Sequence, residues 1–255
     1  MGRHQPSLTL RPGARDDIPP IGTAMVLAAG LGKRMRPLTA TRPKPLVKVA
    51  GKPLLDHVFD RLRAAGIKRA VVNAHYLADA LEAHLRNHVK DIEILISDER
   101  SELLETGGGV LRALPLIGDD RFLVVNSDNL WIDGAVDAIH LLAAAWDDAT
   151  MDALLLVVPL ARANCHKGTG DFHLDPNGRL SRRRPGRVAP FVFTGVQLVS
   201  RRLFADAPEG QFSMNLLWNR AIATGRLHGV VHEGLWFDVG TPPAIARTEA
   251  ILAQG

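Results

Sequence analysis

The stretch AMVLAAGLGKRMRPLTATRPKPLV, residues 24–47, joins an apolar run to a glycine loop that is rich in cations. The apolar run is typical of a buried strand, and glycines in the following loop let backbone N–H groups come close to phosphate oxygens. Arg34 can bind two such oxygens at once, and Lys44 lies between two prolines in a stiff segment. This pattern leaves a dinucleotide, a nucleoside triphosphate and a nucleic-acid backbone open as ligands.

Two familiar phosphate-binding loops do not match this stretch. Gly30-Leu-Gly32 begins like the Rossmann fingerprint, but Met35 stands where its third glycine belongs, and no acidic residue follows at the ribose-binding distance. A Walker A loop needs Ser or Thr after its Gly-Lys pair, whereas Lys33 is followed by Arg34. The sequence therefore excludes a dehydrogenase and a Walker-type site, while the phosphate-binding character of the loop remains.

The composition is that of an ordinary globular protein. With 46% hydrophobic and 23% charged residues, the 255 residues fit one large domain. A net charge of +4 suits a small anionic ligand better than a long DNA tract. The single cysteine, Cys165, fits a reducing compartment, and no apolar stretch reaches the roughly 20 residues of a membrane helix. We expect a cytoplasmic protein without a membrane partner, as a monomer or small homo-oligomer.

Strand and helix patterns alternate along the first 160 residues. Strands are expected at 24–30, 67–74, 92–97, 121–128 and 152–160, and helices at 53–66, 77–88, 108–117 and 134–146. The first helix should carry Pro53 at its first position and Gly66 as its C-terminal cap. The alternation predicts an α/β fold with a Rossmann-like, mostly parallel sheet sandwiched by helices. Ligands of such sheets bind at the carboxyl ends of the strands.

The two ends of the chain differ from this alternating part. Residues 1–22 are rich in Pro, Gly and Arg and lack the apolar segment of a signal peptide, so we expect a flexible N-terminal extension. Residues 23–255 are expected to form the folded domain. Beyond residue 160, strand patterns at 190–200 and 226–240 precede a helix pattern over 241–253, and this part is expected to face the substrate.

The motif G-x-G-x-R-x-x-P-L-T is followed by P-K-P, G-x-P-L, the triplet NSD at 126–128 and WFDVGTP at 236–242. Together they resemble the signature of the sugar-1-phosphate nucleotidyltransferases, over residues 23–255. The resemblance implies an enzyme that joins a nucleoside triphosphate to a sugar 1-phosphate and releases pyrophosphate. Within the family the chain is most similar to the N-acetylmuramate-1-phosphate uridylyltransferases of peptidoglycan recycling, and mannose-1-phosphate guanylyltransferases are near relatives.

The resemblance also implies roles for individual residues. The nucleotide-binding loop would comprise Ala29, Gly30, Gly32, Lys33 and Arg34. Lys44 would neutralise charge near the α-phosphate, and Asp128 and Asp238 would hold Mg²⁺. Arg34, Lys44, Asp128 and Asp238 are therefore the expected catalytic residues. No general base is required, because the attacking phosphate oxygen is already ionised.

Further residues would contact the base and the sugar. In LLETGGG, residues 103–109, Thr106 is expected as the N-cap of a helix. Gly107 would let the base and ribose lie against the start of that helix. By the same resemblance, Asn126 and Asp171 would form hydrogen bonds with the sugar substrate.

The sequence does not decide the exact substrate or the basic residue that holds the sugar phosphate. Many family members hold the sugar phosphate with the lysine of Glu-Lys-Pro, but residues 177–193, NGRLSRRRPGRVAPFVF, contain no such motif. This gap and LLETGGG favour UTP with N-acetylmuramic acid 1-phosphate, although NSD is common among the mannose enzymes. The lactyl carboxylate of muramic acid calls for a cation, for which Lys167 and Arg182 to Arg184 are candidates.

Two other classes of function remain as alternatives. The run RRRPGR could bind nucleic acid, but only 5% of the residues are aromatic, which leaves few platforms for stacking bases. A regulatory relative without catalysis is the second alternative, and the intact set of Arg34, Lys44, Asp128 and Asp238 disfavours it. We therefore expect a nucleoside triphosphate and a sugar 1-phosphate as partners, and no nucleic acid.

Overall fold

A computed structural model describes residues 20–254 of the chain. The extension expected over residues 1–22 lies almost entirely outside the described residues. Ile21 is already buried in the hydrophobic core, and the Gly22 carbonyl accepts hydrogen bonds from the N–H groups of Lys68 and Arg69. The described chain is therefore part of the fold from Ile21 onward.

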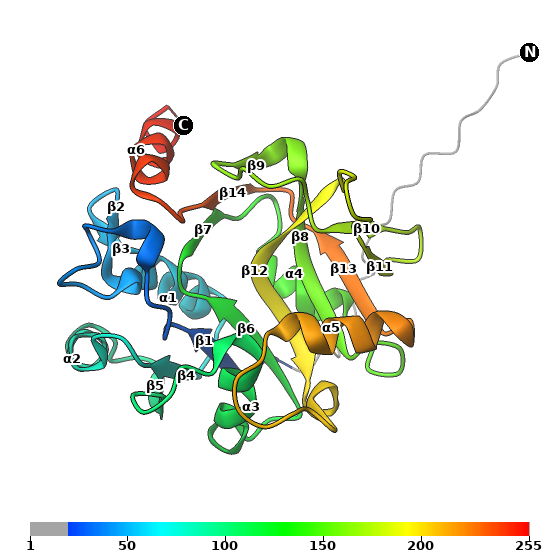
Figure 1. Ribbon diagram of the computed structural model, residues 1–255, viewed down its shortest axis with the longest axis horizontal. Helices are drawn as coiled ribbons and strands as arrows, with labels where there is room; N and C mark the ends of the chain where they lie inside the picture. Colours follow the sequence, from blue (N-terminus) through cyan, green and yellow to red (C-terminus); the bar gives the residue numbers. More distant parts are fainter. Residues whose placement is uncertain (1–19, 255) are drawn as a thin grey trace, which may run out of the picture.

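A mixed, mostly parallel sheet of nine strands forms the centre of the molecule, as predicted (Figure 1). One half consists of four parallel strands in the order β6 (Arg121–Asn126), β1 (Thr23–Leu27), β4 (Arg69–Ala74) and β5 (Glu93–Asp98). The other half contains β12 (Phe191–Ser200), β8 (Ala153–Pro159), β13 (Leu227–Val231), β10 (Phe172–Leu174) and β11 (Leu180–Arg182). Strand β12 runs antiparallel to both β6 and β8, and so joins the two halves.

Alternation of side chains along the strands decides which helices cover each face of the sheet. Ala24 and Val26 of β1 point into a core with α1 (Leu54–Ala64), α2 (Ala78–His88) and α4 (Ala138–Ala145). Met25, between them, points into a second core with α3 (Glu105–Ile117) and α5 (Met214–Ala223). Helices therefore cover both faces, as predicted, although the sequence analysis did not identify α5.

Helix α1 ends as predicted but starts later. Gly66 has a φ of 75°, and the N–H of Ile67 donates a hydrogen bond to the Leu62 carbonyl, which closes the helix. Pro53 was expected at the first helical position, but its ψ of 141° is extended and makes it the residue before the helix. The reason is a two-stranded ribbon at this point, formed by β2 (Lys48–Val49) and β3 (Lys52–Pro53).

The start of helix α3 corrects the expected N-cap. The helix begins at Glu105 with Leu104 as its N-cap, so Thr106 lies inside the first turn. Its hydroxyl oxygen accepts a hydrogen bond from the backbone N–H of Met214, at 2.9 Å. Thr106 is thus engaged by the first residue of α5 and does not cap its own helix.

A second, three-stranded sheet stands beside the first. Its strands are β7 (Asn129–Ile132), β14 (Leu235–Asp238) and β9 (Ala163–Asn164). The strand expected over 226–240 is therefore two strands, β13 and β14, in different sheets. The break falls at Gly234, where the Ile132 carbonyl comes so close that a Cβ would lie 2.0 Å from it.

Strand β12 carries an irregularity where the two sheets meet. The stretch of β12 from Phe193 to Gln197 has five residues but lies opposite only three residues of β8, from Leu155 to Val157, so β12 has two extra residues here. The carbonyl of Thr194 in this bulge accepts hydrogen bonds from Asn129 Nδ2 at 2.6 Å and Trp236 Nε1 at 2.8 Å. One carbonyl therefore ties β7 and β14 to the central sheet.

The C-terminal helix α6 (Pro242–Leu252) follows β14 and packs near the β2–β3 ribbon (Figure 1). Within residues 20–254, every helix is too short or too polar to cross a bilayer.

Candidate functional site

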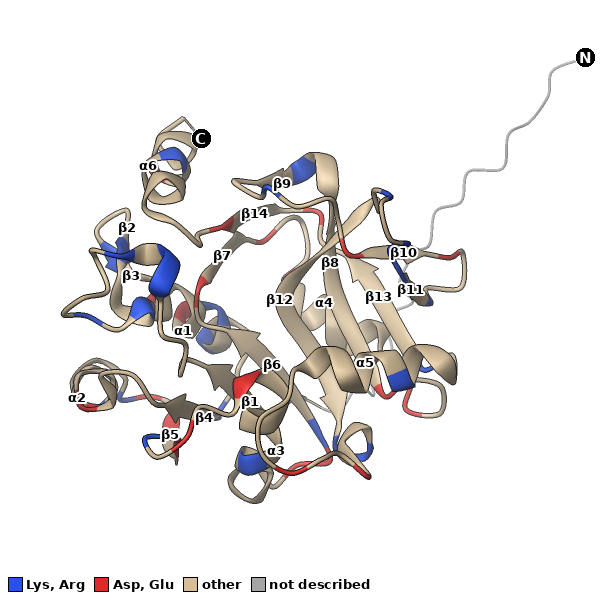
Figure 2. Ribbon diagram, in the orientation of Figure 1, with Lys and Arg blue, Asp and Glu red and all other residues tan. Residues whose placement is uncertain are grey.

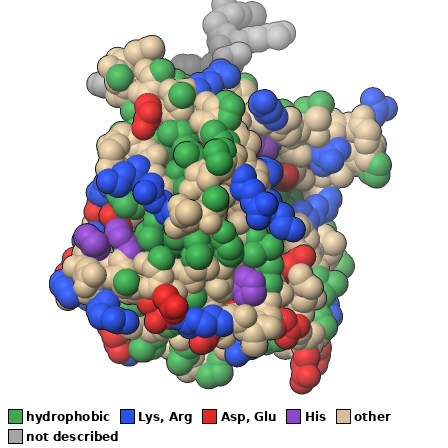
Figure 3. All heavy atoms as spheres, turned by 60° about the vertical axis from the view of Figure 1, so that its left-hand side comes forward, with side chains coloured by type: hydrophobic (Ala, Val, Ile, Leu, Met, Phe, Trp, Pro, Cys, Tyr) green, Lys and Arg blue, Asp and Glu red, His purple; other side chains and the backbone are tan. Residues whose placement is uncertain are grey.

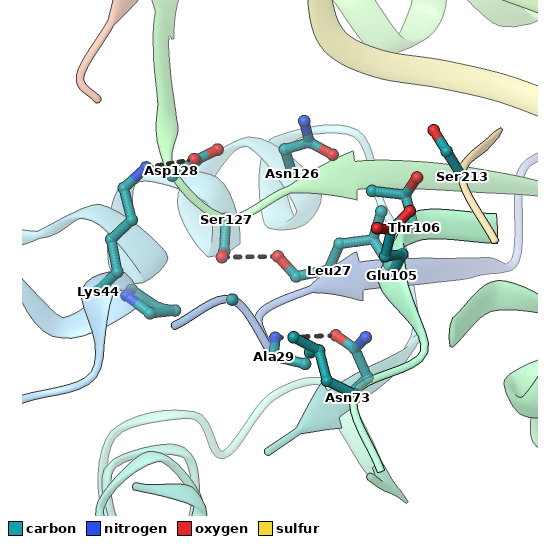
Figure 4. Close-up of a pocket in the computed structure, with 13 residues that line it drawn as sticks. Leu27, Ala29, Lys44, Asn73, Glu105, Thr106, Asn126, Ser127, Asp128 and Ser213 are labelled. Atoms are coloured by element: carbon teal, nitrogen blue, oxygen red, sulfur yellow. Dashed lines mark hydrogen bonds and ion pairs between the residues drawn. The ribbon is translucent and has the colours of Figure 1, made fainter. Parts of the chain in front are cut away.

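A cavity of about 360 Å³ opens where β1 and β6 end (Figure 4). Its position at the carboxyl ends of parallel strands is the one that the sequence predicted for the ligand. The predicted site residues that line it are Ala29, Gly30, Lys44, Asn126 and Asp128. The structure therefore brings together residues from the glycine loop, the P-K-P segment and the NSD triplet.

The glycine loop after β1 is shaped by close contacts at Gly32. Gly32 has a φ of 61°, and a Cβ at this position would lie 2.9 Å from Thr39 Cγ2. The Thr39 hydroxyl donates a hydrogen bond to the Gly32 carbonyl at 2.8 Å. Within residues 20–254, no hydrogen bond uses the backbone N–H of Gly30, Gly32 or Lys33. These donors are available to an anion, as in other loops that cradle phosphates.

Asn73, which the sequence analysis did not identify, holds the start of this loop. Its Oδ1 accepts hydrogen bonds from the N–H groups of Ala28 at 2.6 Å and Ala29 at 3.3 Å (Figure 4). Its Nδ2 donates to Glu99 Oε1 at 2.8 Å, and burial raises the pKa of Glu99. The signal was a polar residue inside the apolar strand VVNA, but its partners lie far away in the sequence.

Lys44 and Asp128, which both line the cavity, form an ion pair. Lys44 Nζ lies 2.5 Å from Asp128 Oδ2, and only 10% of the lysine side chain is exposed (Figure 4). Lys44 begins a short 3₁₀ helix, Lys44–Leu46, directly after Pro43. The lysine is therefore fixed next to the acidic group that follows β6.

Asp238 reaches the same region from β14. The register of β7 and β14 places Asp238 opposite Asn129, the neighbour of Asp128 in the sequence. Asp238 Oδ2 lies 3.1 Å from His166 Nδ1. The Nε2 of His166 is buried and has no hydrogen-bond partner within residues 20–254. His166 was not identified from the sequence, because its link to Asp238 exists only in the fold.

Arg34 extends toward Asp238 across a glycine. A Cβ on Gly240 would lie 3.3 Å from Arg34 Nη1 and 3.0 Å from Asp238 Oδ1. Arg34 and Lys33 are both exposed. Figure 2 shows the basic turn of the glycine loop on the same side as the acidic ends of β14 and of the β6–β7 connection. The four expected catalytic residues thus come from separate elements to one side of the sheet.

The acidic residues fit Mg²⁺ rather than a cage of protein ligands. Within the described chain, no three His, Cys, Asp or Glu side chains gather closely enough to hold a metal ion. Asp128 and Asp238 are each about one-third exposed, at 32% and 30% of the side chain. Mg²⁺ usually takes one or two carboxylates and completes its shell with water and phosphate oxygens. Two partly exposed carboxylates are a suitable donor set for this cation.

A second cavity, of about 270 Å³, adjoins the first. The two share Leu27, Thr106, Asn126 and Ser213, and Asp171 lines the second. Asp171 Oδ2 accepts a hydrogen bond from the Phe193 N–H at 2.9 Å. The two residues expected to bind sugar, Asn126 and Asp171, thus line one cavity.

Gly107 lies outside both cavities. Its N–H donates to the Phe212 carbonyl at 2.8 Å, and a Cβ would lie 2.4 Å from the Phe212 ring. Glu105 and Thr106, from the same turn, line the first cavity instead. Contact between Gly107 and a base stays a prediction.

Comparison with known proteins identifies the family. A family model described as nucleotidyl transferase matches residues 23–165. The chain belongs to this family. It is 49% identical to the N-acetylmuramate alpha-1-phosphate uridylyltransferase of Caulobacter vibrioides, over 91% of this chain and 97% of that protein. It is 34% identical to the enzyme of the same name from Neisseria meningitidis serogroup B, over 89% and 97%.

The fold is shared with solved structures. One is HddC from Yersinia pseudotuberculosis complexed with GMP-PN, with a TM-score of 0.73 and 22% identity over 91% of this chain and 100% of that chain. The family model and the two relatives identify the protein as a nucleotidyltransferase of the sugar-1-phosphate type, as the motifs predicted.

Proposed function

We propose that this nucleotidyltransferase transfers the uridylyl group of UTP to N-acetylmuramic acid 1-phosphate and releases pyrophosphate. The observation that carries the proposal is the pair of adjoining cavities, which meet at Asn126 next to the Lys44–Asp128 pair. Both relatives described above bear the name of this uridylyltransferase, which favours it over a mannose-1-phosphate guanylyltransferase. The nucleotide would occupy the larger cavity and the sugar the smaller one.

The basic residues would bring two anions together. An oxygen of the sugar phosphate attacks the α-phosphorus of UTP in line, and the bond to the leaving pyrophosphate breaks. Arg34 and the free N–H groups of the glycine loop would bind the pyrophosphate, and Lys44 would neutralise charge near the α-phosphate. Proximity and charge neutralisation carry the reaction, because the attacking oxygen needs no base.

Asp128 and Asp238 would hold Mg²⁺ in this proposal. The cation, when bound, supplies positive charge to the phosphate oxygens. Lys44 keeps Asp128 in place from one side, and His166 does the same for Asp238. In the adjoining cavity, Asn126 and Asp171 would form hydrogen bonds with the sugar.

The setting of the enzyme follows from the proposed substrates. UTP is a cytoplasmic nucleotide and N-acetylmuramic acid is a component of peptidoglycan, so we place the enzyme in cytoplasmic recycling of the cell wall. The oligomeric state and the exclusion of nucleic acid stay predictions.

The test is pyrophosphate release with Mg²⁺, measured for the four common nucleoside triphosphates against a panel of sugar 1-phosphates. The expected result is the highest kcat/KM for UTP with N-acetylmuramic acid 1-phosphate. A higher value for GTP with mannose 1-phosphate would overturn the substrate assignment and leave the enzyme class intact.

A further inference from the structure

Arg182, the last residue of β11, is the basic residue that lines the smaller cavity. The acidic residue of that lining is Asp171, whose Oδ2 is engaged by a backbone N–H and forms no ion pair with Arg182 in the described chain. Arg182 therefore adds a positive charge to the cavity that no carboxylate neutralises by direct contact.

Neutral groups hold the guanidinium in place. Its Nε donates to Asn219 Oδ1 at 2.9 Å, and its Nη2 donates to Asn215 Oδ1 at 2.8 Å. Its central carbon lies 4.7 Å from the ring centroid of Phe172 and 5.5 Å from that of Trp218. Within residues 20–254, Nη1 has no hydrogen-bond partner. The two asparagines thus orient the guanidinium through Nε and Nη2, while Nη1 remains available as a donor.

The electrostatic state of Arg182 is that of a partly buried cation. Burial lowers the pKa of Arg182, and the charge of Asp171 opposes this change. An arginine stays protonated in proteins, so the group remains charged. A partly buried cation that no carboxylate contacts directly has a tendency to bind an anion.

The other basic candidates from the sequence are placed differently. The guanidinium of Arg183 donates to two backbone carbonyls near its own loop. Arg184 and Lys167 are exposed, and neither side chain forms a hydrogen bond or ion pair within residues 20–254. Among these four residues, Arg182 is the one that lines the cavity.

The location of Arg182 indicates which part of a substrate it can reach. Lys44 and Asp128 line the larger cavity only, and Arg182 lines the smaller cavity only, with Asn126 shared between them. A sugar 1-phosphate must place its phosphate at the Lys44–Asp128 end in order to react. The group that meets Arg182 therefore belongs to the part of the sugar remote from the phosphate.

We propose that Arg182 binds a carboxylate on the sugar substrate and makes the enzyme selective for a sugar acid over its neutral counterpart. This inference rests on the proposed function, in which the carboxylate is the lactyl group of N-acetylmuramic acid 1-phosphate.

The experiment compares two acceptors with UTP. N-Acetylmuramic acid 1-phosphate carries the lactyl carboxylate, and N-acetylglucosamine 1-phosphate lacks it. Arg182→Met keeps an apolar stem over the aromatic rings and removes the charge. The ratio of kcat/KM for the muramic sugar to that for the glucosamine sugar is expected to fall about 10- to 100-fold. Arg184→Met, in the exposed neighbour, is the matched control and should leave the ratio unchanged.

A second probe isolates the charge. The methyl ester of the lactyl group has nearly the same shape as the acid but is neutral. Wild-type enzyme should prefer the acid to the ester, and Arg182→Met should have lost that preference. Arg182→Lys keeps a charge without the planar fork, so its ratio should fall between those of wild type and Arg182→Met. The lysine variant also provides the test if the methionine variant does not fold.

The outcomes separate the inference from the function on which it rests. Wild-type enzyme that does not use the muramic sugar overturns the proposed function, and the role of Arg182 with it. Wild-type preference that survives in the Arg182 variants overturns the role of Arg182 alone. An equal loss of kcat/KM for both sugars would also overturn the selectivity role, because Arg182 would then stabilise the fold or bind a group that both sugars share.

Discussion

Asp128 pairs with Lys44 and Asp238 pairs with His166, so the two carboxylates can be tested separately. Asp128→Asn and Asp238→Asn keep the size of the side chain and remove its charge. Because each charge is assigned to the metal, each substitution should lower kcat about 10²- to 10³-fold at saturating Mg²⁺. Pyrophosphate release gives kcat, and circular dichroism checks the fold.

A suitable control is Asp120→Asn, because the side chain of Asp120 is 99% exposed and lies in another part of the molecule. It should retain wild-type kcat. Turnover close to that of wild type in either site variant would contradict the metal assignment.

Arg34 is predicted to act through the geometry of its guanidinium as well as through its charge. Arg34→Lys keeps the charge but loses the fork that binds two phosphate oxygens, so kcat/KM for the triphosphate should fall about 10- to 100-fold. Arg36→Lys, two residues away and also exposed, is the matched control. Steady-state kinetics with both variants decide the question, and a silent Arg34→Lys would disprove bidentate binding.

The charged residues of the candidate site are easier to propose from the sequence than the residues that hold them in place. Lys44 and Asp128 belong to local patterns, a cation between prolines and an acid after a strand, and these patterns need no knowledge of the fold. Asn73 and His166 act on residues far from them in the sequence, and only the folded chain creates those contacts. Local pattern therefore indicates what can bind a phosphate, and tertiary structure determines what keeps it in place.

At the level of elements, the glycines that open helix α3 are required by close packing. A Cβ on Gly108 would lie 2.2 Å from the Gly210 carbonyl, although alanine is normally a better helix former than glycine. Gly108→Ala should therefore lower the free energy of unfolding, by about 1–3 kcal/mol. Urea denaturation measures this change.

Gly30 provides the contrast for this experiment. It has no atom within 4 Å of the position that a Cβ would take. Gly30→Ala should leave the free energy of unfolding close to that of wild type. Equal stability of the Gly108 and Gly30 variants would show that the segment around Gly210 moves aside at little cost.

Element prediction succeeded where periodic patterns were long and failed where elements were short. The strands and helices of the parallel half lie within a few residues of their predicted bounds, because apolar periodicity covers each one. β10 and β11 have three residues each, too few to show a period. The pattern over 226–240 looked continuous, because a close backbone approach at Gly234 leaves no periodic signal.

At the level of the whole molecule, two buried histidines should make stability depend on pH. Burial lowers the pKa of His232 and of His228 below the ordinary value of 6.5. Asp133 raises and Arg162 lowers the pKa of His232, and burial outweighs both. A depressed pKa means that the unfolded chain binds the proton more readily. The stability contributed by neutral His232 is thus present above about pH 6.5 and is lost as pH falls through its pKa in the fold.

His232→Gln removes this titration while keeping a group that can donate to the Leu235 carbonyl, as His232 Nε2 can. The melting temperature should fall less for the variant than for wild type between pH 7.5 and pH 5, measured by differential scanning calorimetry. Parallel curves for the two proteins would contradict the assignment to His232.

Positive and negative side chains are mixed over the visible surface of the molecule. Figure 3 shows basic and acidic side chains interspersed over one face, with hydrophobic side chains between them. In the proposed reaction Arg34 would act from the exposed glycine loop, while Lys44 lines one cavity and Arg182 lines the other. The net charge favours an anionic ligand from the sequence alone, whereas the placement of Lys44 and Arg182 in two separate cavities is visible only in the fold.

The bulge in β12 has a consequence for how this strand can change in evolution. Its surplus is two residues and not one, so Val192 and Leu198, which lie before and after the bulge, face the same core. A relative could gain or lose two residues here, and the side chains of the rest of the strand would stay on the same faces of the sheet. A sequence alignment would show this change only as a short gap. A gap that included Thr194 would nevertheless remove the carbonyl that anchors both Asn129 and Trp236. A length difference at this point would therefore mark a lineage that positions its two acidic residues by other means.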